Sequence, residues 1–177
     1  MKKSNFQKDL REAREAEIIA REVLSKTTED YRFYDVSNMK KFRHRGDIVS
    51  RNLKDDSPCF IDVKDDSVIH HTRNILCEDR VSYNGRVQDG FMRYDYDYLC
   101  IVSQPEKRMY LVDFDVLKKH YKQGRYLLQA YDWQYSHTYL FPLRKARKLN
   151  ALVAEIDYSV SDGCYEPVGI RDYRSIS

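Results

Sequence analysis

Gly-Asp-Ile-Val at residues 46–49, followed by Phe-Ile-Asp-Val-Lys at residues 60–64, is the stretch of sequence that decides the fold. Each segment is a short apolar run of the kind that forms a β-strand, and the polar residues between them predict a turn. Side chains two residues apart in a strand point to the same face. We therefore expect a hairpin on which Asp62 and Lys64 project together, with Asp47 on the neighbouring strand.

Two carboxylates beside a lysine are the groups that metal-assisted phosphodiester hydrolysis requires. Carboxylates bind Mg²⁺, and an ammonium orients a water or stabilises developing negative charge. Acids and lysines are frequent in this chain, so an acid-x-Lys triplet is expected by chance. The triplet from Asp62 to Lys64 indicates a site only because its neighbours are apolar and because Asp47 precedes it. An ion pair in an apolar strand is costly to bury and marks a site or an exposed edge more often than a core. The alternative interpretation is a solvated hairpin whose charges point outward.

The composition predicts one domain with its own core. The chain has 177 residues, of which 42% are hydrophobic and 33% are charged, and its fifteen tyrosines argue against disorder. The net charge of +3 allows nucleic-acid binding without demanding it. We expect a single domain over residues 1–177, in which residues 160–177 form a tail that orders only in part.

Several classes of protein are not expected from this sequence. Its four cysteines are widely spaced and form no Cys-x-x-Cys pair, which argues against a zinc site and a disulfide framework. The N-terminal residues lead into a charged segment rather than an apolar signal region, and no apolar run approaches the length of a membrane span. We therefore expect a cytoplasmic protein without a membrane partner. Phosphate-binding glycine loops, nucleophile elbows and zinc-protease motifs are also missing.

Hydrophobic periodicity and turn residues predict the order of the elements. Residues 5–25 contain good helix formers without Gly or Pro, and residues 115–123 predict a helix with Asp115 as N-cap and Gly124 as its stop. A third, basic helix is expected over residues 143–155. Strands are expected over residues 31–36, 46–51, 59–64, 74–78, 96–103, 109–114 and 138–143, the last of them an edge strand, with a turn at residues 84–85. This order predicts an α/β or α+β domain with a central mixed sheet flanked by helices.

Asp47, then Asp62-Val63-Lys64, with an acidic helix upstream, resembles the PD-(D/E)xK nuclease superfamily, which is also called restriction endonuclease-like. In that superfamily one acid lies on one strand of a hairpin, the acid-x-Lys triplet lies on the next, and a glutamate often comes from the preceding helix. Glu17 is the best match for that glutamate. Residue 46 is Gly where the superfamily pattern has Pro, and the triplet begins with Asp where Glu is more usual.

The resemblance implies a restriction endonuclease-like core and a magnesium-dependent nuclease. Asp47, Asp62, the carbonyl of Val63 and Glu17 would bind Mg²⁺, for which Mn²⁺ would substitute, and Lys64 would orient the attacking water. Glu22 or Glu12 could replace Glu17. The resemblance also extends to Glu78 and to the region around Tyr96.

Positive charge precedes the first acid of the motif. A run of basic side chains beside the site would suit a DNA backbone, although such runs are often only solvated loops. The candidate DNA-binding residues are Lys40, Lys41, Arg43, His44 and Arg45. A second basic run, at residues 144–148, would clamp nucleic acid or serve solubility.

Two classes of function therefore remain open. The first is a DNA nuclease, which could act as a homodimer to cut both strands. The second is a nuclease-fold binding protein that occupies a nucleic acid or a protein partner, for example as an inhibitor in a conflict between a cell and a phage or mobile element.

Overall fold

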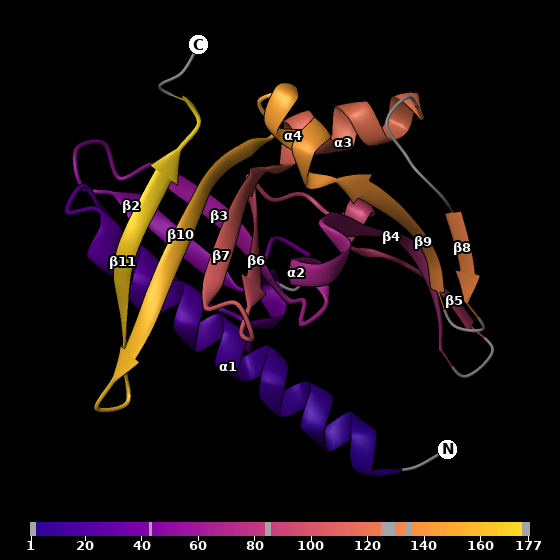
Figure 1. Cartoon of the computed structure of the whole chain (residues 1–177), viewed down its shortest axis with the longest axis horizontal. Coiled ribbons are helices and arrows are strands. Elements are labelled where there is room, and N and C mark those ends of the chain that lie inside the picture. Colours follow the sequence, from indigo (N-terminus) through magenta and orange to yellow (C-terminus); the bar gives the residue numbers. More distant parts are fainter. Residues whose placement is uncertain (1–2, 43, 84–85, 125–129, 134–135, 175–177) are drawn as a thin grey trace.

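The computed structural model describes residues 3–42, 44–83, 86–124, 130–133 and 136–174. It is a mixed α+β structure in which a seven-stranded sheet and a four-stranded sheet share a core (Figure 1). The elements follow one another along the chain as α1 (Lys3–Thr27), β1 (Tyr31–Asp35), η1 (Lys40–Phe42), β2 (Ile48–Asn52), β3 (Pro58–Asp65), α2 (Ile69–Thr72), β4 (Asn74–Tyr83), β5 (Arg86–Asp89), η2 (Phe91–Arg93), β6 (Tyr98–Ser103), β7 (Arg108–Asp113), α3 (Phe114–Gln123), β8 (Ala130–Trp133), β9 (Ser136–Pro142), α4 (Leu143–Lys148), β10 (Leu152–Ser161) and β11 (Cys164–Asp172).

The seven-stranded sheet has the order β1-β2-β3-β6-β7-β10-β11. Its first three strands form an antiparallel meander, β6 then runs parallel to β3, and the remaining neighbours are antiparallel. This arrangement confirms the predicted central mixed sheet. The connection from β3 to the parallel β6 is long and carries α2, β4, β5 and η2.

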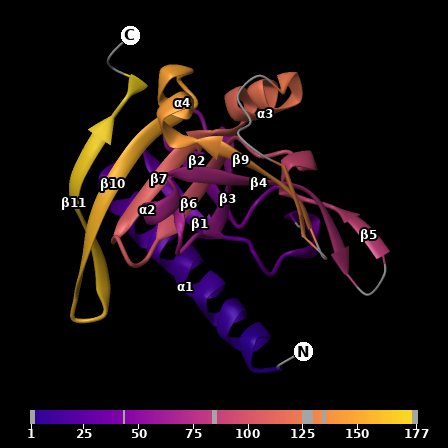
Figure 2. The ribbon, with the colours of Figure 1, turned by 45° about the vertical axis from the view of Figure 1, so that its right-hand side comes forward.

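The four-stranded sheet has the order β5-β4-β9-β8 and is antiparallel throughout. Figure 2 shows it on the opposite side of the molecule from the β10–β11 hairpin. The short strand predicted at residues 74–78 is the first half of β4, which continues to Tyr83. The strand predicted at residues 138–143 is β9, but the prediction of an edge strand was wrong because β9 lies between β4 and β8. The turn predicted at residues 84–85 lies outside the described residues.

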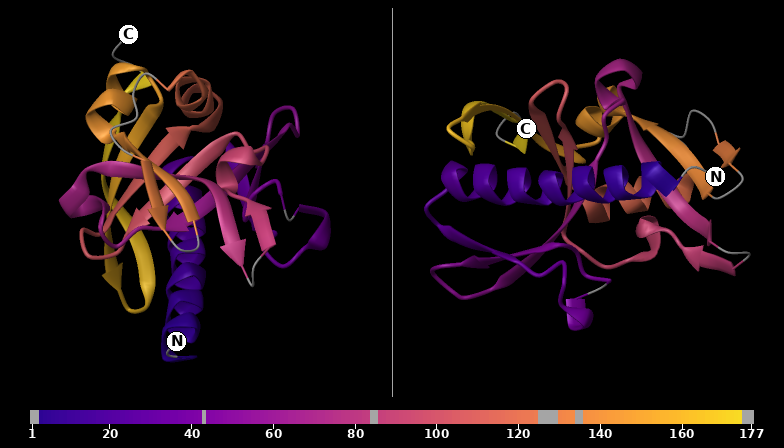
Figure 3. Two further views of the ribbon diagram at one scale, coloured as in Figure 1. Left: turned by 90° about the vertical axis from the view of Figure 1, so that its right-hand side faces the viewer. Right: turned by 90° about the horizontal axis from the view of Figure 1, so that it is seen from below.

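Helix α1 covers one face of the seven-stranded sheet. Its buried side chains recur at helical spacing, as Ala16, Ile19, Ala20 and Val23, because one stripe of the helix faces the sheet. They form one buried hydrophobic cluster with residues from the five strands β2, β3, β6, β7 and β10. The N-terminal part of α1 continues beyond the sheet (Figure 3). The helix predicted over residues 5–25 is thus confirmed and slightly longer at both ends.

The opposite face of the large sheet packs on α3, α4, η2 and the second sheet. This second cluster includes Phe60 of β3, Tyr110 of β7, Phe114 of α3 and Phe141 of β9, all of them buried. Alternation along β3 therefore separates its side chains between the two layers: Ile61 and Val63 pack with α1, whereas Asp62 and Lys64 lie on the other face and pair with one another. The predicted common face for Asp62 and Lys64 is confirmed.

The C-terminal third differs most from the prediction. Helix α4 ends at Lys148, because Asn150 takes a left-handed φ of 57°, and the chain continues as the buried strand β10 rather than as a helix to residue 155. Residues 160–177 were predicted to be a partly ordered tail. This prediction was wrong, because residues 160–161 complete β10 and half of the segment forms β11, which pairs with β10 along nearly its whole length.

A two-residue turn explains this hairpin. Asp162 and Gly163 both have positive φ, at 51° and 77°, and connect the paired residues Ser161 and Cys164. Asp-Gly is a preferred sequence for such turns because both central residues must adopt φ > 0.

Helix α3 also begins earlier than predicted. Its N-cap is Asp113, whose carboxylate accepts a hydrogen bond from the Val116 N–H, whereas the predicted cap Asp115 lies within the first turn.

Among the described residues, no helix is both long and apolar enough to cross a membrane. Gly124 ends α3 in a left-handed conformation, with a φ of 66°, as the sequence predicts.

Candidate functional site

Asp47 is held against the middle of β3 by an unusually close backbone approach. Gly46 has a φ of 108°, and a Cβ added to it would lie 2.6 Å from the Ile61 carbonyl oxygen. The Asp47 N–H donates to that same oxygen at 2.9 Å, and Asp47 Oδ2 accepts from the Val63 N–H at 2.9 Å. The Gly at the position where the PD-(D/E)xK pattern has Pro is therefore required by the local geometry.

Asp62 and Lys64 form a close ion pair on β3. Lys64 Nζ lies 2.5 Å from Asp62 Oδ2 and donates a longer hydrogen bond, at 3.4 Å, to the Val63 carbonyl oxygen. Asp62 is only 6% exposed, and burial raises its pKa, while the Lys64 ammonium opposes that rise. Burial disfavours the charge on Lys64, but Asp62 and then Asp47 outweigh that effect and raise its pKa, so the ammonium stays charged.

Glu17 reaches the same group of charges from α1. Its pKa is raised to about 7, first by burial and then by the Asp47 carboxylate, while Ser37 and Lys64 oppose the rise. The two substitute candidates are engaged elsewhere. Glu12 pairs with Lys8 at 3.5 Å, and Glu22 accepts a hydrogen bond from the Tyr165 N–H at 3.2 Å. Glu17 is thus the helix glutamate that lies with Asp47.

A cleft of about 450 Å³ opens between α1 and the segment that connects β1 to β2. Its wall on α1 combines apolar and basic side chains with Glu17, and its opposite wall is polar and acidic. Leu10 and Ile18, on the helix wall, are each 43% exposed. The lining residues are Leu10, Ala13, Arg14, Glu17, Ile18, Asp35, Ser37, Asn38 and Asp47.

The long connection between β3 and β6 supplies groups on the other side of Lys64. The ring of Phe91 in η2 lies 5.5 Å from Lys64 Nζ. Glu78 of β4 is half-buried, and burial raises its pKa while Lys64 opposes the rise. Tyr96 is buried near Asp62, and burial together with that carboxylate raises its pKa. No sequence pattern indicated Phe91, and Glu78 and Tyr96 were indicated only through the resemblance.

The basic residues before Asp47 lie on the surface next to this hairpin. Lys40, Lys41, His44 and Arg45 are exposed, and none of them forms an ion pair with another described residue. The guanidinium of Arg45 stacks on the Phe60 ring at 4.3 Å, which ties the loop to β3. Arg43 lies outside the described residues.

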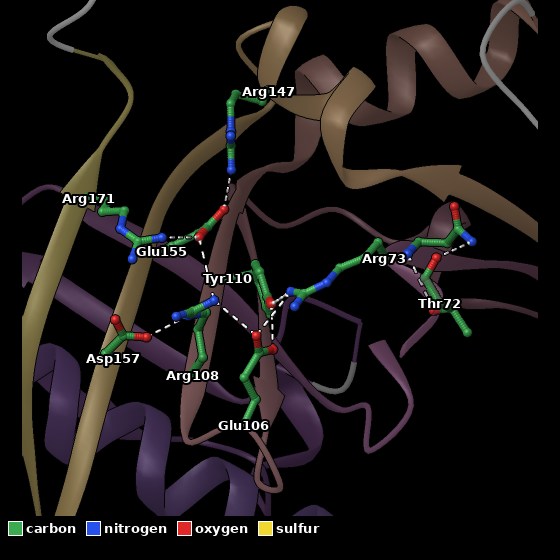
Figure 4. A network of polar contacts seen from close by, with 10 residues as sticks. Thr72, Arg73, Glu106, Arg108, Tyr110, Arg147, Glu155, Asp157 and Arg171 are labelled. Carbon is green, nitrogen blue, oxygen red and sulfur yellow. Dashed lines mark hydrogen bonds and ion pairs between the residues drawn. The ribbon is translucent and has the colours of Figure 1, made fainter. Parts of the chain in front are cut away.

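The second basic run includes a residue with a structural contact. Arg147 donates to the buried carboxylate of Glu155 at 2.6 Å and lies 4.5 Å from the Tyr173 ring. Glu155 also accepts from Arg171, and Figure 4 shows these groups joined through Arg108 to further acids. Arg147 is therefore engaged in holding α4 on β10 rather than free for a ligand.

Among the described residues, no three His, Cys, Asp or Glu side chains lie close enough together to hold a metal ion as they stand. The chemistry of the donor atoms nevertheless fits a cation. The Lys64 ammonium lies against one Asp62 oxygen and the Val63 carbonyl oxygen, both of which are hard oxygen ligands of the type that Mg²⁺ takes.

No protein-family model, curated protein or solved structure matches this chain.

Proposed function

We propose that this protein is a Mg²⁺-dependent nuclease with a restriction endonuclease-like core that hydrolyses DNA phosphodiesters. The order of the elements supports this proposal: α1 carries Glu17, Asp47 directly precedes β2, and the antiparallel partner β3 carries Asp62 and Lys64. That is the order in which the superfamily carries its helix glutamate, its first acid and its acid-x-Lys triplet.

The contact between Lys64 and its own strand carries the proposal. One buried carboxylate oxygen and one backbone carbonyl oxygen converge on a single positive charge. Asp62, Asp47, the Val63 carbonyl and Glu17 are the groups that would hold Mg²⁺ or Mn²⁺. When bound, the cation would lower the pKa of a water and neutralise charge on the phosphate. Lys64, which stays protonated, would place its ammonium beside the phosphoryl oxygens and stabilise the charge that develops there.

The cleft supports a nucleic-acid strand as the substrate. Arg14 lies one helical turn from Glu17, is exposed, and has no ion-pair partner among the described residues. Its guanidinium can take a phosphate, while the exposed Leu10 and Ile18 offer apolar contact to a sugar or a base. The basic residues at positions 40–45 would meet the backbone on the other side of Asp47.

The test is cleavage of labelled duplex, single-stranded and branched DNA with Mg²⁺ or Mn²⁺. Asp62→Asn and Lys64→Met should abolish cleavage, and Arg14→Gln should weaken DNA binding in the presence of EDTA about tenfold or less, as expected for one phosphate contact. Asp30→Asn is the control, because it removes one partner of the exposed Asp30–Lys54 ion pair. Cleavage that survives either substitution on β3 would refute the assignment.

A DNA-binding protein without nuclease activity is the second candidate. The observation that favours it is the Asp62–Lys64 ion pair, which balances the charge of the acid without a metal, together with the lack of three converging ligands among the described residues. In that case folded wild-type protein would bind DNA, as measured by fluorescence anisotropy, and would cut none of the substrates with either metal.

A further inference from the structure

Lys64 has a second set of neighbours that comes from outside its own sheet. Strands β4 and β5 of the second sheet and helix η2 all lie in the connection between β3 and β6, and this connection brings further groups to the Lys64 ammonium. The Phe91 ring lies 5.5 Å from the ammonium, close enough for a favourable cation–π contact. Glu78 is the acid that this connection brings to the same place.

Backbone packing fixes Glu78 and Phe91 to one another. A Cβ on Gly90 would lie 2.3 Å from the Glu78 carbonyl oxygen, so the chain before η2 lies directly on β4 at this residue. The Gly90 N–H also donates to the Asp79 carbonyl at 2.8 Å. The hydroxyl of the buried Tyr96 donates to the Phe91 carbonyl oxygen at 3.3 Å. The backbone of Glu78 is therefore fixed against Gly90, one residue before Phe91, whose ring Lys64 contacts.

Within the part of the chain that the structure describes, no cation other than Lys64 acts on the Glu78 carboxylate. Glu78 is half-buried, and within the described residues its carboxylate forms no ion pair and no hydrogen bond. Lys64 is the charged group that acts on its pKa, and Glu78 in turn helps to keep Lys64 protonated. A half-buried carboxylate without a partner is unfavourable, so an arrangement that brings the ammonium to it gains free energy.

We propose that Glu78 is a positioning residue that receives the Lys64 ammonium when a divalent cation binds to Asp62 and the Val63 carbonyl. The inference rests on the proposed function, because it concerns the same cation site. In the metal-free chain Lys64 lies on the two oxygens that the cation needs, so the cation binds only as the ammonium leaves. Glu78 and the Phe91 ring lower the free-energy cost of moving the Lys64 ammonium away from Asp62. Lys64 then stays charged at the edge of the site, where the phosphate of a substrate would lie.

The experiment is calorimetric titration of the full chain with Mg²⁺, and separately with Mn²⁺, in the absence of DNA. We expect Glu78→Gln to weaken Mg²⁺ binding about tenfold, because the ammonium then has no acid to move to. Glu29→Gln removes one exposed carboxylate elsewhere and is the control for net charge. In the Lys64→Met background there is no ammonium to displace, so adding Glu78→Gln should change the affinity less than twofold.

Two results would overturn the inference while leaving the proposed function intact. One is an unchanged Mg²⁺ affinity in Glu78→Gln. The other is the same loss in both backgrounds, which would mean that Glu78 acts on the cation directly rather than through Lys64. If the folded wild type binds neither metal, the proposed function fails and the inference falls with it. Urea unfolding of each variant shows whether it is folded, and Glu78→Asp should restore part of the affinity.

Discussion

Replacing Gly46 with alanine tests whether backbone contact places the first acid of the site. The methyl group would come within 2.6 Å of the Ile61 carbonyl oxygen and 3.0 Å of the Asp62 nitrogen, both of which belong to the backbone of a central strand. Neither atom can turn away as a flexible side chain would. The substitution must therefore separate β2 from β3 at the point where Asp47 bonds to the Val63 N–H.

The expected cost has two parts. A non-glycine residue at a φ of 108° costs about 1–3 kcal/mol in backbone strain. Forcing an additional carbon into a packed region costs about another 1–3 kcal/mol. We therefore expect Gly46→Ala to lower the free energy of unfolding by about 2–6 kcal/mol.

Gly163→Ala is the matched control, because Gly163 also has a positive φ, of 77°, but nothing lies within 4 Å of an added Cβ. It should cost only about 1–2 kcal/mol. Urea unfolding monitored by circular dichroism gives both values, and the slopes must agree with wild type for the comparison to hold. Equal losses in the two variants would show that the contact with Ile61 does not constrain Gly46, and our account of how Asp47 is positioned would be wrong.

Three further changes have definite expected outcomes. The raised pKa of Glu17, about 7, means that the folded protein binds a proton at this residue more tightly than the unfolded chain, so Glu17 lowers the free energy of unfolding as pH rises from about 4.5 to 7. In urea unfolding with EDTA, Glu17→Gln should therefore gain stability relative to wild type between pH 5 and pH 8. A difference in unfolding free energy between the two proteins that does not change with pH would contradict the assigned pKa. Glu155→Ala should lose about 1–3 kcal/mol in urea unfolding, because it removes the buried carboxylate to which both Arg147 and Arg171 hydrogen-bond. Arg171→Ala removes only one exposed partner of that carboxylate and should lose less than about 1 kcal/mol, so equal losses would refute this ranking. The double variant Asp62→Leu with Lys64→Met should unfold at the wild-type urea concentration or higher, since a packed apolar pair often replaces a buried ion pair without loss, and a variant less stable than either single substitution would show that the pair stabilises the fold.

The hairpin at the centre of the site was predictable because every signal for it is local. The alternation of apolar and charged residues from Phe60 to Lys64 fixes which side chains share a face, and the structure has that arrangement. Helix α1 was predictable for the same reason, since its buried stripe recurs at helical spacing. Local patterns of this kind specify an element and its faces without reference to the rest of the chain.

The C-terminal hairpin was missed although a local signal was present. Asp162-Gly163 is a strong hairpin sequence, but β11 is mostly exposed and has no apolar run that would mark it as a strand. Phe91 and Glu78 could not have been placed at the site by any local pattern. Their position depends on how a whole second sheet packs against the first, which periodicity does not encode.

The cost of the central hairpin is itself an argument for a function. Asp62 and Lys64 occupy adjacent same-face positions beside the apolar core residue Phe60, where two aliphatic side chains would pack without any desolvation penalty. Gly46 adds a second unfavourable choice one residue before Asp47, since glycine loses more entropy on folding than any other residue. A sequence under no demand except folding avoids buried charges and unneeded glycines. Where proteins do contain such unfavourable residues, these lie mostly at functional sites, because the chemistry there requires charge in a low dielectric. Both unfavourable choices lie at one place, where the chain entering β2 meets β3, and Glu17 reaches the same place from a helix that could have placed any side chain there. A binding protein that needed only a basic surface would not require Gly46, Asp47 and Glu17 beside the Asp62–Lys64 pair, which is why we rank catalysis first.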